Sequence, residues 1–101
     1  MSLENEFTQA LESTVDVAKK RGYVPTYFMQ MLAEYGGVGT AKRLLAKSEL
    51  QEGLFELWRL NLLHESMEAV VVQEKYQTLF TEGEVAEANR RLEELGYFKK
   101  G

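Results

Sequence analysis

The segment from residue 22 to residue 47 constrains the fold more than any other part of the sequence, because it contains the only proline and half of the eight glycines. Pro25 holds the preceding residue in an extended conformation and suits the first turn of a helix, where its missing N–H would have no partner. Gly36-Gly37 then stops a helix. The segment therefore predicts two short helices joined by a glycine-rich elbow, the second helix having Thr40 as its cap.

Amphipathic patterns outside this segment predict a helix near each end of the chain. Apolar side chains recur every three or four positions over residues 3–21, and Ser2 stands where an N-cap is expected. Near the C-terminus, Thr81 and Glu84 have the spacing of a capping box, in which each side chain binds a free backbone N–H of the other residue. This second pattern predicts a helix that ends at Gly96.

The part of the chain between these patterns is less regular. Residues 48–63 fit a further helix that must break near residues 61–64, although no strong breaker stands there. The consecutive valines at 70–72 favour a strand by propensity. Because the chain offers no partner strand, we expect a helix capped by Ser66 here, with an intermolecular strand formed on dimerisation as the open alternative. Residues 74–80 form a connector whose large apolar side chains point inward.

Together these elements predict an all-α fold, a compact orthogonal bundle of about five to six short helices. The 101 residues fit one domain, 1–101, with frayed ends at 1–2 and 99–101. Apolar residues make up 45% of the chain and charged residues 28%. These shares are ordinary for a globular protein, so we expect a modest core that needs no disulfide or metal.

The composition also excludes several classes of function. The chain has no cysteine, which excludes disulfides, thiolate metal sites and cysteine nucleophiles and suits a reducing compartment. No apolar run approaches the roughly 20 residues that span a membrane, and the N-terminus lacks the pattern of a signal peptide. We therefore expect a cytoplasmic protein with no membrane partner. Its net charge of −4 repels phosphate backbones at long range.

The glycine-rich elbow is the first candidate site. Gly37 and Gly39, followed by a short helix, are similar to a helix-hairpin-helix, in which backbone N–H groups bind a DNA phosphate. Lys42, Arg43 and Lys47 would supply the positive charge. The packing alanine of that motif stands too close to the second glycine here. A tight turn between packed helices is therefore the simpler explanation.

A wider positive patch would form if the cations that end the first helix reached this elbow. Lys19, Lys20 and Arg21 stand at the end of the helix expected over residues 3–21. With the elbow cations they would make a basic surface on an acidic protein, which is typical of nucleic-acid binding. Compensation of the helix dipole explains the three cations without any ligand.

His64, Glu65 and Glu68 form the candidate metal or hydrolase site. His64 and Glu68 stand one helical turn apart, but the zinc-protease signature needs a second histidine and this chain has one histidine in total. Ser66 beside His64 lacks a positioned acid for a catalytic triad. Surface residues at a helix start are the simpler explanation. We therefore expect no catalytic residue, no metal and no cofactor, and do not expect an enzyme.

Tyr23 and Tyr27 are the candidate contact residues. They flank Pro25, where the chain turns, so we expect them to stay partly exposed. Aromatic side chains dominate the energetics of protein interfaces, so exposed tyrosines favour a binding surface. Core packing explains the other aromatic residues of the chain equally well.

Beyond these local patterns, the chain resembles a known family in several longer motifs. They read GYxPTYFxQMLxEYGGVxTAKRLL over residues 22–45, GLFxLW over 53–58, MEAV over 67–70, LFTxxE over 79–84 and AxxRL over 88–92. These motifs resemble a small, largely uncharacterised bacterial all-helical domain. The resemblance covers residues 22–97. It implies a domain that occurs alone at about this length or as a C-terminal tail of larger proteins, nucleases among them, and it implies no chemistry.

The sequence thus favours a non-catalytic interaction module over two rivals. Its partner is expected to be another protein, a second copy or a fused domain, meeting the surface of residues 23–27 and 36–43. The main alternative is an accessory nucleic-acid-binding domain that uses the elbow N–H groups and the cations beside them. A small hydrolase or metalloprotein built on His64 is the third hypothesis, and the missing second histidine counts against it.

Overall fold

The computed structural model describes residues 2–47 and 51–98, and every regular element among them is helical. In chain order these elements are α1 (Leu3–Lys20), α2 (Thr26–Leu45), α3 (Glu52–Arg59), the 3-10 helix η1 (Leu63–Glu65), α4 (Met67–Val71), the 3-10 helix η2 (Glu74–Leu79) and α5 (Glu82–Glu94). The all-α prediction is confirmed. The Cα radius of gyration is 12.6 Å, as expected for a folded chain of this length.

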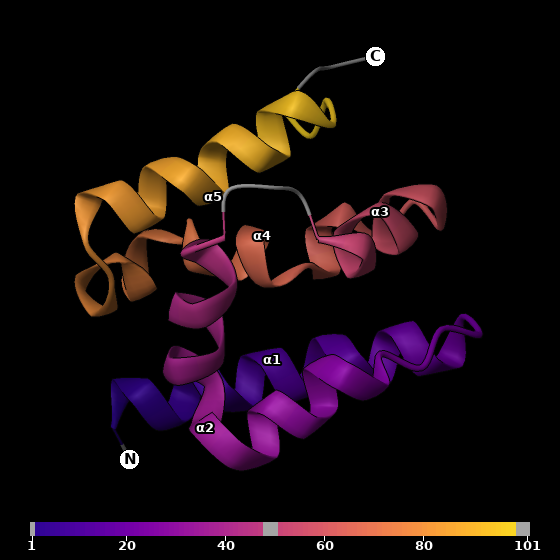
Figure 1. Ribbon diagram of the computed structural model, residues 1–101, viewed down its shortest axis with the longest axis horizontal. Coiled ribbons are helices and arrows are strands. Elements are labelled where there is room, and N and C mark those ends of the chain that lie inside the picture. Colours follow the sequence, from indigo (N-terminus) through magenta and orange to yellow (C-terminus); the bar gives the residue numbers. More distant parts are fainter. Residues whose placement is uncertain (1, 48–50, 99–101) are drawn as a thin grey trace.

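The helices pack in layers around the short helix α4. Figure 1 shows α1 and the first half of α2 side by side in one layer, with α4 between that layer and α5. The second half of α2 turns away from α1 and runs across the other helices toward α5, which it contacts. This crossing joins the two outer layers. None of the described helices is both long and apolar enough to cross a membrane.

The ends of α1 and α5 follow from the residues that the sequence marks. The Ser2 hydroxyl accepts the N–H of the third residue of α1 at 3.1 Å. The capping box is complete: the Thr81 N–H donates to Glu84 at 2.8 Å and the Glu84 N–H donates back at 3.1 Å. Gly22 and Gly96 follow the two helices with positive φ angles of 91° and 78°. These predictions are therefore confirmed.

The elbow in α2 differs from the prediction in one respect. Only Gly36 departs from helical geometry, with φ 74° and ψ 178°, and the helix resumes at Gly37. Thr40 is fully buried inside the resumed helix, so the prediction that it caps a helix is wrong. The cap comes instead from α1, because the Thr8 hydroxyl accepts the Gly37 N–H at 2.9 Å.

In the middle of the chain, α3 is shorter than the helix expected over residues 48–63, of which 48–50 lie outside the described residues. The expected break occurs at Asn61, which has a positive φ of 62°. Residues 70–72 are not extended: the first two belong to α4, and the Ser66 hydroxyl caps this helix by accepting the Ala69 N–H at 3.1 Å. The helical prediction is confirmed for this segment.

The core forms where α1, α2, α4 and η2 meet. Phe7 is fully buried, and its ring lies edge-on against Tyr76 and Phe80, with centroid distances of 5.2 Å to each. Both partners come from the connector that was predicted to point its apolar side chains inward. Leu11 and Val71 are also fully enclosed. The core thus holds α1 and α4 in fixed positions beside the cleft described next.

Candidate binding cleft

A cleft of about 390 Å³ opens between the C-terminal half of α1 and the start of α2 on one side and α3 on the other. It is lined by Thr14, Val15, Ala18, residues 23–28, Leu44, residues 51–54, Glu56, Leu57, Glu65, Met67 and Glu68. The buried apolar members of this set are Val15, Ala18, Leu44, Leu54 and Met67. The cleft therefore combines an apolar interior with a polar margin.

The connection between α1 and α2 builds the first wall. Residues 21–25 lie outside both helices, because Pro25 keeps the chain from continuing helically at the residue before it. Tyr23 is half-buried and Tyr27 is 63% exposed, and both line the cleft. The expectation that these two tyrosines stay partly exposed is confirmed, and the structure brings them to one cleft.

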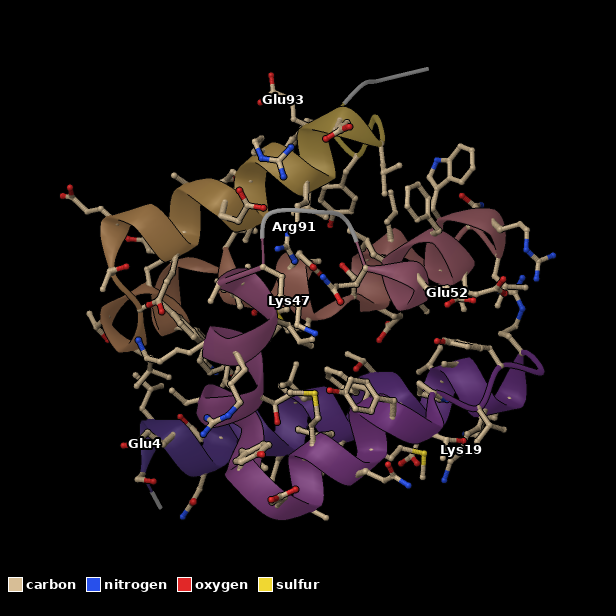
Figure 2. The ribbon with its side chains drawn as sticks, in the orientation of Figure 1. Glu4, Lys19, Lys47, Glu52, Arg91 and Glu93 are labelled. Carbon is tan, nitrogen blue, oxygen red and sulfur yellow. The ribbon has the colours of Figure 1, made fainter. Side chains whose placement is uncertain are left out.

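The second wall is the side of α3 that carries Glu52, Gly53 and Glu56. Gly53 lets the two walls approach each other, because a Cβ at this position would lie only 3.1 Å from the Tyr23 hydroxyl oxygen. Figure 2 labels Glu52 on the α3 side of the cleft. A glycine early in a helix is unfavourable by propensity, so its place here is explained by this approach.

The lining of the cleft is acidic. Among the residues that the structure describes, four glutamates line it, Glu52, Glu56, Glu65 and Glu68, and no lysine or arginine does. Burial raises the pKa of the Tyr23 hydroxyl, and the negative charges of Glu56 and Glu52 raise it further. The field of these two carboxylates therefore reaches the tyrosine on the opposite wall.

Glu68 is the lining residue whose surroundings differ most from the expectation. The sequence suggested a surface glutamate at a helix start, but its exposed fraction is 3%. Its carboxylate accepts a hydrogen bond from Arg91 Nη1 at 3.1 Å. Burial raises the pKa of the Glu68 carboxyl, although the Arg91 charge acts in the opposite direction. The surface interpretation is therefore wrong for Glu68.

Arg91 ties three helices together behind the cleft. It is fully buried, and Figure 2 shows it reaching from α5 toward the end of α2 near Lys47. Its Nη2 donates to the carbonyl oxygens of Leu44 and Lys47 at 3.0 and 2.7 Å, and its Nε donates to Glu87 at 2.7 Å. Sequence reasoning missed this residue. A signal exists, because Arg91 follows the fully buried Ala88 by one helical turn.

Both elbow glycines pack closely against other residues of the protein. The Gly37 N–H donates to Thr8, and a Cβ on Gly37 would lie 2.7 Å from the Thr8 Cα atom. A Cβ on Gly39 would lie 3.0 Å from the Cβ atom of Tyr35. Gly37 therefore serves the contact between α1 and α2, the role of a tight turn between packed helices.

Two of the three cations beside the elbow also have partners. Lys42 forms an ion pair with Glu84 at 2.7 Å. The Arg43 guanidinium lies 3.7 Å from the centre of the Tyr35 ring, a cation–π contact. Lys47 is exposed. The structure thus places Lys42, Arg43 and Lys47 along the second half of α2 and at its end, and none of the three lines the cleft.

The cations that end α1 do not join the elbow. Gly37 packs against Thr8, and Lys19 lies 11 residues further along α1, or about 16 Å along a helix axis. Figure 2 shows Lys19 at the opposite end of α1 from Glu4. Arg21 turns toward the other side of the cleft and donates to the Leu60 carbonyl at 3.1 Å. The hypothesis of one converging basic patch is therefore wrong.

The three candidate metal residues do not come together in one site, because Glu68 is engaged elsewhere. His64 has a side chain 60% exposed and lies 3.9 Å from Glu65, whereas Glu68 is buried against Arg91. Across residues 2–47 and 51–98, no group of three or more histidine or acidic side chains could hold a metal ion. In the structure, Glu68 therefore serves the buried ion pair.

The fold and the cleft define a helical domain with an acidic recess that has tyrosines on one wall. Comparisons of the chain with protein-family models, with curated proteins and with solved structures gave no match. The resemblance to a bacterial helical domain therefore stays a prediction, and the function has to be inferred from the geometry of the cleft.

Proposed function

We propose that this protein is a non-catalytic interaction module that takes up a segment of a partner protein in the cleft. The observation that carries the proposal is the position of Tyr23 and Tyr27 on one wall of a recess with an apolar interior. Aromatic anchors beside a desolvated pocket are typical of the few contacts that dominate protein interfaces. The volume, about 390 Å³, lies within the usual range of binding sites.

The part of the cleft lining that comes from α4 and the end of α2 is held in place before any partner arrives. Arg91 bonds to Glu68, which lines the cleft, and to the carbonyl of Leu44, which also lines it. The two donor–acceptor distances are 3.1 and 3.0 Å. A preformed recess loses less conformational freedom on binding than a mobile surface does. This network therefore supports a binding role.

The partner is proposed to be another protein or a domain fused to this one. This agrees with the resemblance to a bacterial domain that occurs alone or as a tail of larger proteins, and we propose the cytoplasm as its location. Nucleic-acid binding through the elbow has less support. The Gly37 N–H is already bonded, and Lys42 is already paired with Glu84.

The test is a selection of random peptides displayed on phage, using the immobilised full chain as target. Tyr27→Ala removes the most exposed tyrosine that lines the cleft. Tyr35→Ala is the matched control, because Tyr35 lies on the same helix, is 40% exposed and stands outside the cleft. We expect enriched peptides to lose at least about tenfold in affinity for Tyr27→Ala, a loss of about 1.4 kcal/mol.

Binding of the same peptides to Tyr35→Ala is expected to be unchanged. Two results would overturn the proposal. The first is a selection that enriches no peptide over an unrelated helical protein of similar charge. The second is a set of peptides whose affinity falls in Tyr35→Ala and not in Tyr27→Ala, which would place the binding surface at the elbow.

A further inference from the structure

Some of the glutamates that line the cleft already have an arginine partner among the described residues, and others do not. Glu68 is paired with Arg91, and Glu56 is paired with Arg59 at 2.6 Å. Glu52 and Glu65 have no lysine or arginine partner within the described part of the chain. Two carboxylates thus face the same cleft without a permanent positive charge beside them.

The remaining lining fits a long aliphatic stem. Val15, Leu54 and Met67 are buried apolar side chains that border the cleft from α1, α3 and α4. Tyr23 and Tyr27 add aromatic rings, whose faces attract cations. Lysine and arginine combine such a stem with a terminal charge, and they bury the stem while the charge stays near polar groups.

We infer that a lysine or arginine side chain of the partner protein anchors the bound segment in this cleft. The aliphatic stem lies against the apolar interior, and the cation faces Glu52 and Glu65. This inference rests on the proposed function and adds the chemistry of the partner to it. An acidic or phosphorylated segment would instead meet the uncompensated negative charges of Glu52 and Glu65, which disfavour its entry.

Capped pentapeptides with the pattern Ala-Ala-X-Ala-Ala test the inference by titration into the labelled full chain, followed by backbone amide NMR shifts. X is lysine, arginine, norleucine or glutamate. Norleucine keeps the stem of lysine without its charge. We expect the lysine and arginine peptides to shift the amides of residues 23, 24, 26–28, 51–57 and 65–68 with millimolar affinity. The norleucine peptide should bind at least about fivefold more weakly.

A pair of variants separates the cleft carboxylates from the general acidity of the protein. The double variant Glu52→Gln with Glu65→Gln is expected to bind the lysine peptide no better than the norleucine peptide. The control carries Glu12→Gln with Glu34→Gln, which removes the same charge at exposed positions outside the cleft. This control should keep the preference for lysine over norleucine.

Each of the other outcomes overturns the inference. Equal affinity for the norleucine and lysine peptides would show that the charge contributes nothing, and the proposed function would stand with an apolar anchor. Equal shifts of the same amides by putrescine or Mg²⁺ would show that the cleft takes free cations. No shift in the cleft with any peptide would remove the basic anchor, and the phage selection would then decide separately whether the cleft binds protein segments.

Discussion

At the scale of single residues, Gly37 is the position where an added methyl group has the clearest expected effect on the free energy of unfolding. A Cβ there would lie 2.7 Å from the Thr8 Cα atom and 2.8 Å from its hydroxyl oxygen, and the Cα atom belongs to the backbone of α1. We expect Gly37→Ala to lower the free energy of unfolding by about 2 kcal/mol, as overpacking does. The measurement is the urea midpoint at an unchanged m-value.

Gly83→Ala is the matched control for that substitution. Gly83 lies in the first turn of α5, and the nearest atom to an added Cβ is the Thr81 hydroxyl oxygen at 3.9 Å. Helix propensity favours alanine, so the free energy of unfolding should stay the same or rise by up to about 1 kcal/mol. An equal loss of stability in both variants would refute the steric explanation.

Glu87 makes the free energy of unfolding of the protein depend on pH in the acid range. Hydrogen bonds from Arg90, together with those from Arg91, lower the pKa of its carboxyl from 4.5 to about 2. The folded chain therefore keeps the carboxylate ionised where the unfolded chain binds a proton. The stabilisation is complete above a pH of about 4.5 and is lost as the pH falls toward 2.

We expect Glu87→Gln to lose less stability than the wild type between a pH of about 5 and a pH of about 3. Urea midpoints at these two pH values measure the difference. Glu93→Gln is the control on the same helix, because Glu93 is exposed and has no ion pair within the residues described. Its acid dependence should match that of the wild type. A wild-type dependence in Glu87→Gln would count against the role given to Glu87.

The residues of the site were predictable only where their surroundings are local. Tyr23 and Tyr27 flank Pro25, so their exposure follows from the turn that this proline makes. Glu68 and Arg91 stand 23 residues apart, and nothing near either one marks the other as a partner. An arginine is seldom buried unless it is paired, so the residue type favours a surface side chain at position 91, although this position lies one helical turn after the apolar Ala88.

At the scale of helices, the two breaks in the chain use different backbone conformations. Gly36, with φ 74° and ψ 178°, occupies a region that essentially only glycine adopts. Asn61, with φ 62°, has the positive φ that asparagine tolerates. We expect Gly36→Asn to lower the free energy of unfolding by about 1–3 kcal/mol. Asn61→Gly should change it by less than about 0.5 kcal/mol.

Thermal or urea unfolding of the two single variants checks this contrast. The substitutions exchange the same two residue types at exposed or half-buried breaks, so differences in side-chain burial are small. If Gly36→Asn were as stable as Asn61→Gly, the bend within α2 would not depend on the glycine conformation. The bend would then be set by the packing of the second half of α2.

Whether a cap comes from a nearby or a distant residue in the chain explains which helix ends the sequence predicts well. The N-termini of α1 and α5 are capped from within three residues of the start, by Ser2 and by the pair Thr81 and Glu84. The restart of α2 is capped by Thr8, which stands 29 residues away in the chain. A cap supplied by another helix leaves no local pattern, so the sequence alone favours the nearby hydroxyl of Thr40.

At the scale of the whole molecule, the buried contacts of Arg91 link the layers of helices. Its guanidinium joins α5 to Glu68 in α4 and to the carbonyl oxygens at the end of α2. Because Glu68 and Leu44 also line the cleft, the same contacts hold the binding site. Breaking one partner of a buried ion pair leaves the other without compensation and typically costs about 3–5 kcal/mol.

A double-mutant cycle tests this role. We expect Arg91→Met to lower the free energy of unfolding by about 3–5 kcal/mol, and the double variant with Glu68→Met to lose less than this single variant, because no uncompensated carboxylate stays buried. Arg90→Met is the matched control, since Arg90 is the neighbouring arginine and pairs with Glu87 and Glu94 at the exposed surface. Its loss should be much smaller, as for most surface ion pairs. A double variant that loses as much as the two single variants combined would show that Glu68 and Arg91 contribute independently, and the tie between the layers would then rest on the carbonyl contacts at the end of α2.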